Sequence, residues 1–230
     1  MMERFKELFL DRKYRLPRIW SNRELKRFAH LFEGAVLNVS GWKDEDKEGG
    51  HYRDYFRNAG QYFISNYKKE VKGLQGLENE FFLDLTEDLP KEYLNRFDVV
   101  FNHTTLEHIY DINKAFQNLC NLSKDVLIII APFLQPMHGD YGDYWRLSPL
   151  TVKRLFEENG FALLYLNSNH HRHASVYLFA VGTKNPSKWK HKIEYRFSIQ
   201  SQKDRFDDFE NLVGCRAISN SWLYKIRRFF

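Results

Sequence analysis

Five short apolar runs, each followed by a polar loop or a helical pattern, constrain the fold of this chain most strongly. They cover residues 35–39, 61–65, 80–83, 97–101 and 125–131. Within these runs the apolar residues largely follow one another instead of alternating with polar ones. Such continuity is typical of strands that are covered on both faces in a parallel sheet. The pattern therefore predicts an α/β fold in which strands and helices alternate.

Helical periodicity between and after these runs supports the same fold class. Asp111 is suited to cap a helix. The apolar residues of that helix, spaced to form one buried stripe, are Ile112, Ala115, Phe116, Leu119 and Cys120. Ser148 and Pro149 open a second helix, which ends at Asn159-Gly160. Its inward residues are Val152, Leu155 and Phe156.

Two further apolar runs, at 161–167 and 175–183, are joined by the polar residues 168–173 and predict an antiparallel hairpin. Together, the runs predict a Rossmann-like, doubly wound sheet of seven strands. An antiparallel C-terminal hairpin completes this sheet, and helices cover both of its faces.

The residues before the first run are basic and aromatic and have helical spacing. Ser21 is suited to cap this helix, with Leu25, Phe28 and Phe32 near one face. We therefore expect three parts: an N-terminal helical segment (1–33), a main α/β domain (34–184) and a basic aromatic C-terminal extension (185–230).

The charge of the chain is unevenly placed. The formal net charge is +5, and residues 185–230 hold ten Lys or Arg against five Asp or Glu. This excess is small and is not interleaved along the predicted cleft, so we expect no nucleic-acid partner. Residues 221–230 are aromatic and basic, which suits peripheral membrane contact, packing on the chain's own body, or contact with a second copy or a partner enzyme. We favour packing.

Cysteine usage and hydropathy bear on the compartment. Cys120 and Cys215 form neither a metal motif nor a disulfide framework, which favours a reducing environment. The N-terminus has no apolar stretch long enough for a secretory signal. The longest apolar run, 126–134, is too short to span a bilayer. These features predict a cytoplasmic protein.

Ligands of doubly wound sheets bind at the carboxyl ends of the strands. Ser40-Gly41 follow the first run, where a glycine allows the backbone to approach a ligand closely. Asp84 follows the third run and is suited to accept a hydrogen bond from an adenine amino group or a ribose. At both places the alternative is an ordinary turn.

Two groups of histidines raise the question of a metal site. His103 and His108 flank Glu107, but their spacing of five residues does not suit a helical pair, and no third ligand is evident. Residues 169–173 (NHHRH) fall in the predicted hairpin turn, where a solvated cluster is more frequent. The sequence therefore predicts no metal, and it assigns Glu107 and His108 to holding their loop in place.

A long irregular segment follows the fifth run, and such loops are often functional. Its candidate substrate contacts are His138, Asp140, Asp143, Tyr144 and Arg146. His138 is also a candidate general base, since its ordinary pKa is near ~6.5. In the alternative interpretation, Tyr144 packs against the protein and Arg146 pairs with a nearby acid.

Several of these segments form a recognisable series. Leu106-Glu107-His108 follows the fourth run, Asp111 comes three residues later, Pro132 ends the fifth run, and Asp143-Tyr144-Trp145-Arg146 precedes the next helix. In this order and spacing, residues from about 36 to 183 resemble class I S-adenosylmethionine-dependent methyltransferases. The resemblance is to a small branch associated with glycan and surface-polysaccharide biosynthesis.

The resemblance implies S-adenosylmethionine as the cofactor. The residues that would hold it are Asn38, Val39, Ser40, Gly41, Asn66, Asp84, Leu85, Asn102 and His103. In the family, the first four positions lie against the methionine part and ribose, and the acid usually found at position 66 holds the ribose hydroxyls. Asp84 and Leu85 fall where adenine is gripped, and Asn102 and His103 fall beside the reacting methyl group.

Two positions depart from the family pattern. Gly41 stands alone where the family usually has Gly-x-Gly, and Asn66 stands where the family usually has an acid. An amide can still hydrogen-bond a hydroxyl, but the charge-assisted contact of a carboxylate, roughly twice as strong, is lost. Two hypotheses follow. The chain is an O-methyltransferase acting on a sugar or glycan intermediate, with His138 or His103 as base. Alternatively, it is a catalytically inactive protein of the same fold that binds a partner in such a pathway.

Overall fold

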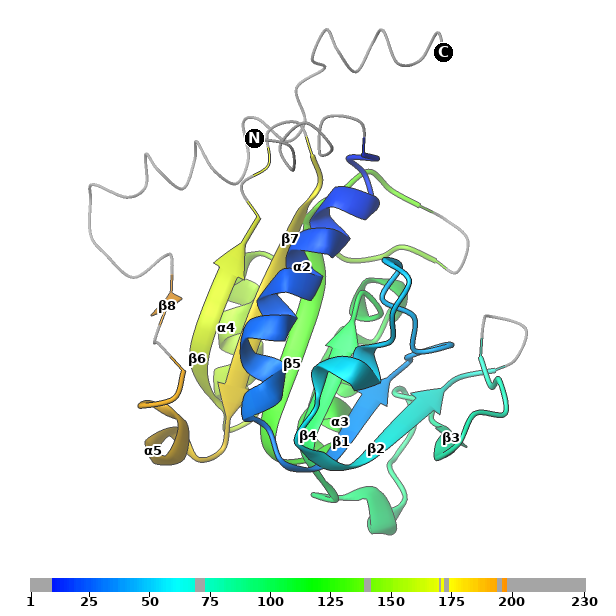
Figure 1. The fold of residues 1–230 in the computed structure, drawn as a ribbon, viewed down its shortest axis with the longest axis vertical. Helices are drawn as coiled ribbons and strands as arrows, with labels where there is room; N and C mark the ends of the chain where they lie inside the picture. The colour runs from blue at the N-terminus through cyan, green and yellow to red at the C-terminus, as the bar shows by residue number, and fades with distance from the viewer. Residues whose placement is uncertain are drawn as a thin grey trace, which may run out of the picture.

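The computed structural model describes residues 10–68, 73–138, 142–169, 171 and 174–193, and the backbone of residues 196–197. One mixed sheet forms its centre, with strand order β3-β2-β1-β4-β5-β7-β6-β8 (Figure 1). The strands are β1 (Gly34–Val39), β2 (Ala59–Asn66), β3 (Glu80–Phe82), β4 (Phe97–His103), β5 (Ser123–Leu134), β6 (Ala162–Ser168), β7 (Val176–Thr183) and β8 (Arg196–Phe197).

Strands β1 to β5 pair in parallel, and β7 runs antiparallel between β5 and β6. The predicted seven strands and the antiparallel C-terminal hairpin are confirmed. The two-residue β8 adds an eighth strand beside β6. Strand order reverses between β1 and β4, so the loops that follow these neighbours lead away from each other and leave room for a ligand.

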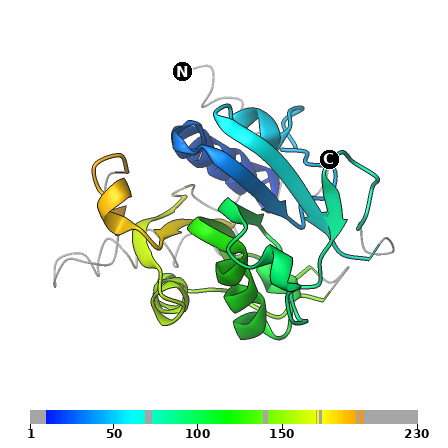
Figure 2. The same cartoon turned by 90° about the horizontal axis from the view of Figure 1, so that it is seen from below.

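Helices cover both faces of the sheet, as predicted (Figure 2). The α-helices are α2 (Arg15–Phe28), α3 (Ile112–Leu122), α4 (Pro149–Glu158) and α5 (Pro186–Trp189). The 3₁₀ turns are η1 (Ala29–Leu31), η2 (Tyr52–Tyr55), η4 (Lys91–Tyr93) and η5 (Leu106–His108). Helices α3 and α4 pack on one face, and α2 packs on the other.

The two predicted caps on one face of the sheet are confirmed. The Asp111 side chain accepts a hydrogen bond from the backbone N–H of Lys114 at the start of α3, and Ser148 does so from Thr151 in α4. The predicted apolar stripes of both helices are buried, including Cys120. Helix α4 ends at Glu158, and Gly160, two residues later, has a φ of +76° that suits a glycine.

Helix α2 begins earlier than predicted, because Asp11 rather than Ser21 caps it. The Asp11 carboxylate accepts hydrogen bonds from the backbone N–H groups of Lys13, Tyr14 and Arg15. Ser21 is instead buried inside the helix and faces the sheet. The predicted apolar residues of this segment, Leu25, Phe28 and Phe32, are buried in the core shared with the sheet.

The C-terminal extension is described only in part. Trp189 of α5 packs edge-on against Phe32, with ring centroids 5.1 Å apart. Cys215 and the aromatic basic residues 221–230 lie outside the described residues, and the three domain boundaries stay predictions. Among the helices that the structure describes, none combines the length and the apolar character that crossing a bilayer requires.

Candidate functional site

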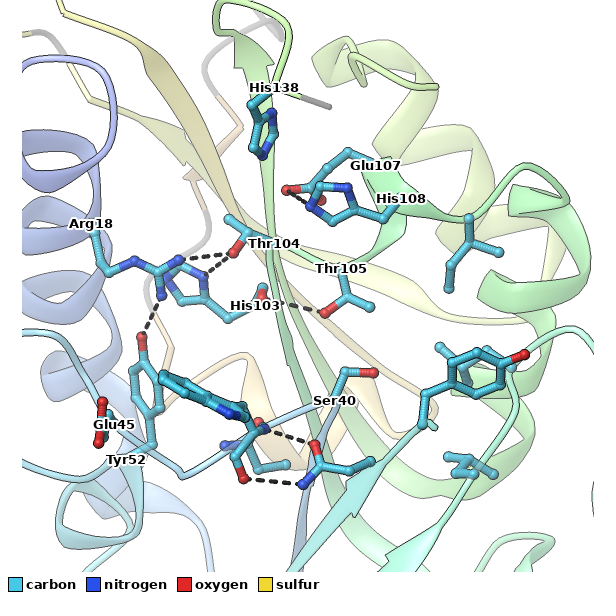
Figure 3. A pocket seen from close by; sticks show the side chains of 18 of the residues that line it. Arg18, Ser40, Glu45, Tyr52, His103, Thr104, Thr105, Glu107, His108 and His138 are labelled. Atoms are coloured by element: carbon cyan, nitrogen blue, oxygen red, sulfur yellow. Dashed lines mark hydrogen bonds and ion pairs between the residues drawn. The ribbon is translucent and has the colours of Figure 1, made fainter. Parts of the chain in front are cut away.

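A cavity of about 730 Å³ lies at the carboxyl ends of β1 to β4, where the strand order reverses (Figure 3). Its volume falls in the range of roughly 300–1,000 Å³ that is usual for small-molecule sites. The predicted site residues that line it are Asn38, Ser40, Gly41, Asn66, Asp84, Leu85, His103, His138 and Tyr144. The fold thus brings together residues from five separate segments of the chain.

Other predicted site residues do not line the cavity. Val39 and Asn102 are buried and paired with each other at the carboxyl ends of β1 and β4, and Asn102 Nδ2 donates to the Val39 carbonyl at 3.1 Å. Asp143 and Arg146 pair beside the cavity. Asp140 lies outside the described residues. A direct ligand contact of these five residues stays a prediction.

The loop after β1 adopts an unusual backbone. Ser40 and Trp42 have φ values of 57° and 49°, in the left-handed region that glycine normally occupies. Such a conformation costs a non-glycine residue about 1–2 kcal/mol. Gly41 lies between them, and a Cβ there would come within 2.6 Å of Asn38 Nδ2. Gly41 is therefore required for close approach within the protein.

Asn66 holds this loop in place. Its Oδ1 accepts from the Trp42 backbone N–H at 2.7 Å, and its Nδ2 donates to the Trp42 carbonyl at 3.0 Å and to Glu80 Oε1 at 2.5 Å. A carboxylate at this position could not donate to that carbonyl. The two departures from the family pattern are therefore linked, because the amide at position 66 fixes the loop that lacks the usual glycines.

Buried Asp44 fixes the far side of the same loop. Its carboxylate accepts from Asn38 Nδ2 at 2.8 Å, from the Tyr62 hydroxyl at 2.7 Å and from the Arg53 backbone N–H at 3.0 Å. Each of these donors comes from an element other than the loop itself. The loop is consequently held in one shape beside the cavity.

Asp84 combines the two roles considered for it. Its Oδ1 accepts from the backbone N–H and the hydroxyl of Thr86, at 2.8 and 2.7 Å, so it caps a turn. It also lines the cavity. Within the described part of the chain its Oδ2 has no hydrogen-bond partner, so this oxygen can accept a hydrogen bond from a ligand.

Arg18 of α2 is a cavity residue that sequence reasoning missed. Its half-buried guanidinium donates to the Tyr52 hydroxyl at 3.1 Å and to Thr104 Oγ1 at 3.0 Å. Thr104 has a φ of 49°, which is rare for a β-branched side chain, and such strain clusters at functional sites. The sequence pattern that could have indicated Arg18 is its spacing of three residues from Ser21, which places two polar side chains beside the apolar stripe of this helix.

His103 lies beneath Arg18. Its Nε2 is 2.8 Å from Ser21 Oγ, and its Nδ1 is 3.1 Å from Thr104 Oγ1. Burial, reinforced by the positive charge of Arg18, holds the pKa of His103 well below its usual value. His103 is therefore neutral at neutral pH. Because hydroxyls engage both ring nitrogens, it is less suited than His138 to act as a base.

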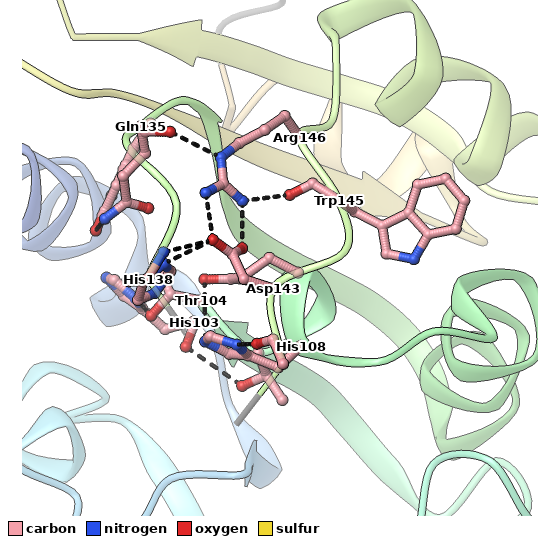
Figure 4. A network of polar contacts seen from close by, with 12 residues as sticks. His103, Thr104, His108, Gln135, His138, Asp143, Trp145 and Arg146 are labelled. Atoms are coloured by element: carbon pink, nitrogen blue, oxygen red, sulfur yellow. Dashed lines mark hydrogen bonds and ion pairs between the residues drawn. The ribbon is translucent and has the colours of Figure 1, made fainter. Parts of the chain in front are cut away.

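A partly buried ion pair between Asp143 and Arg146 orients His138 (Figure 4). The Asp143 carboxylate accepts from Arg146 Nη1 at 2.5 Å and Nη2 at 2.6 Å, which matches the alternative in which Arg146 pairs with an acid. Asp143 Oδ2 also accepts from the His138 backbone N–H at 2.8 Å and lies 3.1 Å from His138 Nδ1. Burial opposes ionisation, but these hydrogen bonds lower the pKa of Asp143.

Glu107 is the least expected feature of the cavity. Its side chain is 1% exposed, and neither carboxylate oxygen has a hydrogen-bond partner among the described residues. Burial raises the pKa of Glu107 to about 8. Its Oε1 lies 3.8 Å from His108 Nε2, while His108 Nδ1 lies 2.5 Å from the Gly142 carbonyl oxygen. The sequence placed both residues correctly in the loop but gave no sign of this environment.

Comparison with known proteins supports the fold. No protein-family model and no curated protein matches the sequence. A candidate methyltransferase from Bacillus halodurans C-125 superposes with a TM-score of 0.56 at 12% identity, over 70% of this chain and 97% of its own. This chain has the class I methyltransferase fold.

Two further solved structures share this fold and were determined with bound S-adenosylhomocysteine. N-methyltransferase NodS from Bradyrhizobium japonicum WM9 has a TM-score of 0.52 at 12% identity, over 79% of this chain and 96% of its own. Magnesium protoporphyrin IX methyltransferase ChlM from Synechocystis PCC 6803 has a TM-score of 0.51 at 10% identity, over 80% of this chain and 94% of its own. The reactions in these names differ, so the fold does not indicate the acceptor.

Proposed function

We propose that this chain is an S-adenosylmethionine-dependent methyltransferase that methylates a hydroxyl oxygen of a sugar or glycan intermediate. One observation carries the proposal. Seven of the nine residues that the family resemblance assigns to the cofactor, all but Val39 and Asn102, line one cavity at the point where strand order reverses. Cofactor-dependent methyltransferases of this fold, such as NodS and ChlM, bind S-adenosylhomocysteine.

The residues present fit the cofactor's chemistry. Asp84 Oδ2 can accept from ribose hydroxyls or an adenine amino group, and the backbone after β1 is held rigidly against the cavity. Asn66 contributes mainly by fixing that backbone. When bound, the cofactor supplies a methyl group made electrophilic by the adjacent sulfonium. Alignment of the acceptor oxygen with that methyl group can lower the barrier by roughly 7–11 kcal/mol.

The protein's own part is to place the acceptor and take its proton. Asp143 receives the Nδ1–H of His138, which leaves the lone pair of the neutral ring on Nε2. His138 lines the cavity, so this nitrogen is the candidate acceptor for the hydroxyl proton. Tyr144 also lines the cavity and would contact the acceptor. Asp140 lies outside the described residues and stays a candidate from the sequence alone.

The alternative function, an inactive binding protein, requires that the cavity no longer accept the cofactor. The side chains that could fill the cofactor space are those of Trp42 and Lys43, and Lys43 does not line the cavity. Trp42 is one of the residues lining a cavity of about 730 Å³, so its indole leaves this space open. This observation favours the enzyme.

The proposal is tested by methyl transfer from tritium-labelled S-adenosylmethionine to a panel of sugars, nucleotide sugars and glycan fractions. We expect tritium in one acceptor class, with an equal amount of S-adenosylhomocysteine formed. Asp84→Ala should abolish the transfer, while Glu87→Ala, an acid in the same segment that does not line the cavity, should not. Labelling of an amine or carbon acceptor would contradict the O-methylation of sugars.

A further inference from the structure

We propose that Glu107, His108 and His138 bind one divalent transition-metal ion inside the cavity. One potential ligand atom of each residue lies within 4.8 Å of those of the other two, and all three residues line the cavity (Figure 3). The sequence predicted no metal because no third ligand was evident beside Glu107 and His108. The fold supplies that ligand from the loop after β5.

The carboxylate of Glu107 is the first reason for a cation here. It is buried, and its two oxygens have no hydrogen-bond partner within the described residues. Buried polar groups are nearly always paired, since an unpaired one costs free energy. A metal ion between Glu107 and the two imidazoles would supply the missing partner.

The second reason is the way both imidazoles are held. His108 Nδ1 faces the Gly142 carbonyl oxygen at 2.5 Å, and His138 Nδ1 faces the Asp143 carboxylate at 3.1 Å. An oxygen that can only accept fixes the proton on Nδ1 in each ring, and the lone pair then lies on Nε2. Metal-binding histidines are typically held in this way by a carbonyl or carboxylate behind the ring.

The donor set indicates the class of ion. Two imidazole nitrogens and one carboxylate oxygen suit Zn²⁺ and its first-row neighbours, whereas Mg²⁺ and Ca²⁺ prefer oxygen ligands. Ligands about 2 Å from zinc in a tetrahedral site lie roughly 3.3 Å apart. The 3.8 Å between Glu107 Oε1 and His108 Nε2 is close to this spacing, and small side-chain rotations would bridge the difference.

Three protein ligands leave a coordination position for an oxygen atom of a small molecule. This inference does not depend on the proposed function, and it revises one assignment made there. If His138 binds the ion, its lone pair is not available for a proton. Coordination of the acceptor oxygen, which lowers the pKa of a bound hydroxyl, would then take over the role assigned above to His138.

The test is direct metal binding by full-length protein with any affinity tag removed and treated with a chelator. Zn²⁺ is titrated by calorimetry, and Co²⁺ is followed by visible absorption. We expect one ion per chain at micromolar affinity or tighter. Glu107→Gln, which keeps the side-chain shape, and His108→Ala should each weaken binding at least tenfold, with circular dichroism verifying the fold.

Two control variants test four of the other histidines. His30→Ala alters an exposed histidine outside the cavity, and a triple alanine variant of His170, His171 and His173 removes the histidine-rich segment. Both should bind the ions as the wild type does. Absence of saturable binding up to about 1 mM, or equal binding by Glu107→Gln, would overturn the proposal. Binding of S-adenosylhomocysteine is measured in the same samples. If the cofactor product binds but the metal does not, the metal site is wrong while the proposed function stands.

Discussion

Restoring the acid that the family pattern has at position 66 should damage this protein. In Asn66→Asp the side chain keeps its shape but loses both of its donors. One of these reaches the Trp42 carbonyl, and the other reaches the Glu80 carboxylate. The new carboxylate would face two acceptors at a position that is 2% exposed.

The size of the effect follows from these contacts. A typical hydrogen bond contributes about 1 kcal/mol to the free energy of unfolding, and one to a charged partner about 1.5–3 kcal/mol. Burying a charge beside another carboxylate adds to this loss. We therefore expect Asn66→Asp to lower the free energy of unfolding by at least about 3 kcal/mol. With a urea slope of about 2–3 kcal/mol/M, the midpoint falls by about 1 M or more.

Urea unfolding followed by tryptophan fluorescence measures this change. Asn79→Asp is the matched control, because Asn79 is exposed and makes one long contact, 3.3 Å, to the Tyr62 carbonyl. It should cost less than about 1 kcal/mol. Two results would show that the Asn66 amide does not fix the loop at Trp42. One is a free energy of unfolding for Asn66→Asp within about 0.5 kcal/mol of the wild-type value, and the other is tighter binding of S-adenosylhomocysteine.

Three other predictions concern stability. Gly41→Ala should lower the free energy of unfolding by roughly 1–3 kcal/mol, whereas Gly60→Ala, whose Cβ would lie 3.7 Å from its nearest contact, should cost less in the same urea experiment. Arg18→Lys loses the paired contacts to Tyr52 and Thr104, so it should lower the free energy of unfolding, measured in urea, by about 2 kcal/mol. Tyr52→Phe removes one of these contacts and should lower it by less. Burial of Asp125 opposes ionisation, but four side-chain hydrogen bonds lower its pKa. Its stabilising effect is therefore present above the unfolded value of about 3.9 and is lost as the pH falls through the folded value. Unfolding free energies should show Asp125→Asn less stable than the wild type at neutral pH, with a gap that narrows in acid.

The fold could be predicted from the sequence because local patterns and long-range packing agree. Continuous apolar runs marked the strands, of which β4 and β5 are almost entirely buried, whereas the edge strand β3 is partly exposed, contrary to the expectation. The stripe from Ile112 to Cys120 marked a helix with one buried face. The start of α2 was missed because Asp11, four residues before the helix, provides the cap. Ser21 has the residue type of a cap but serves inside the fold.

The site was predictable only where its residues follow strands. Asp84 and Ser40 were found because they come directly after apolar runs. Arg18 lies on a helix that precedes the sheet, and its contact with Thr104 joins residues 86 positions apart in the sequence. The grouping of Glu107 with His138 likewise depends on how two loops meet. The roles of Asn66 and Arg146 depend on their hydrogen-bond partners, which the spacing of residues in the sequence does not reveal.

The central claim is that the cavity after β1 to β4 binds the methyl-donating cofactor. Calorimetric titration of the purified full-length chain with S-adenosylhomocysteine tests it most directly. We predict one site with micromolar affinity, weakened at least tenfold by Asp84→Ala and unchanged by Glu87→Ala. Absence of binding up to about 1 mM, equivalent to roughly −4 kcal/mol, in folded protein would contradict the claim and direct attention to partner proteins.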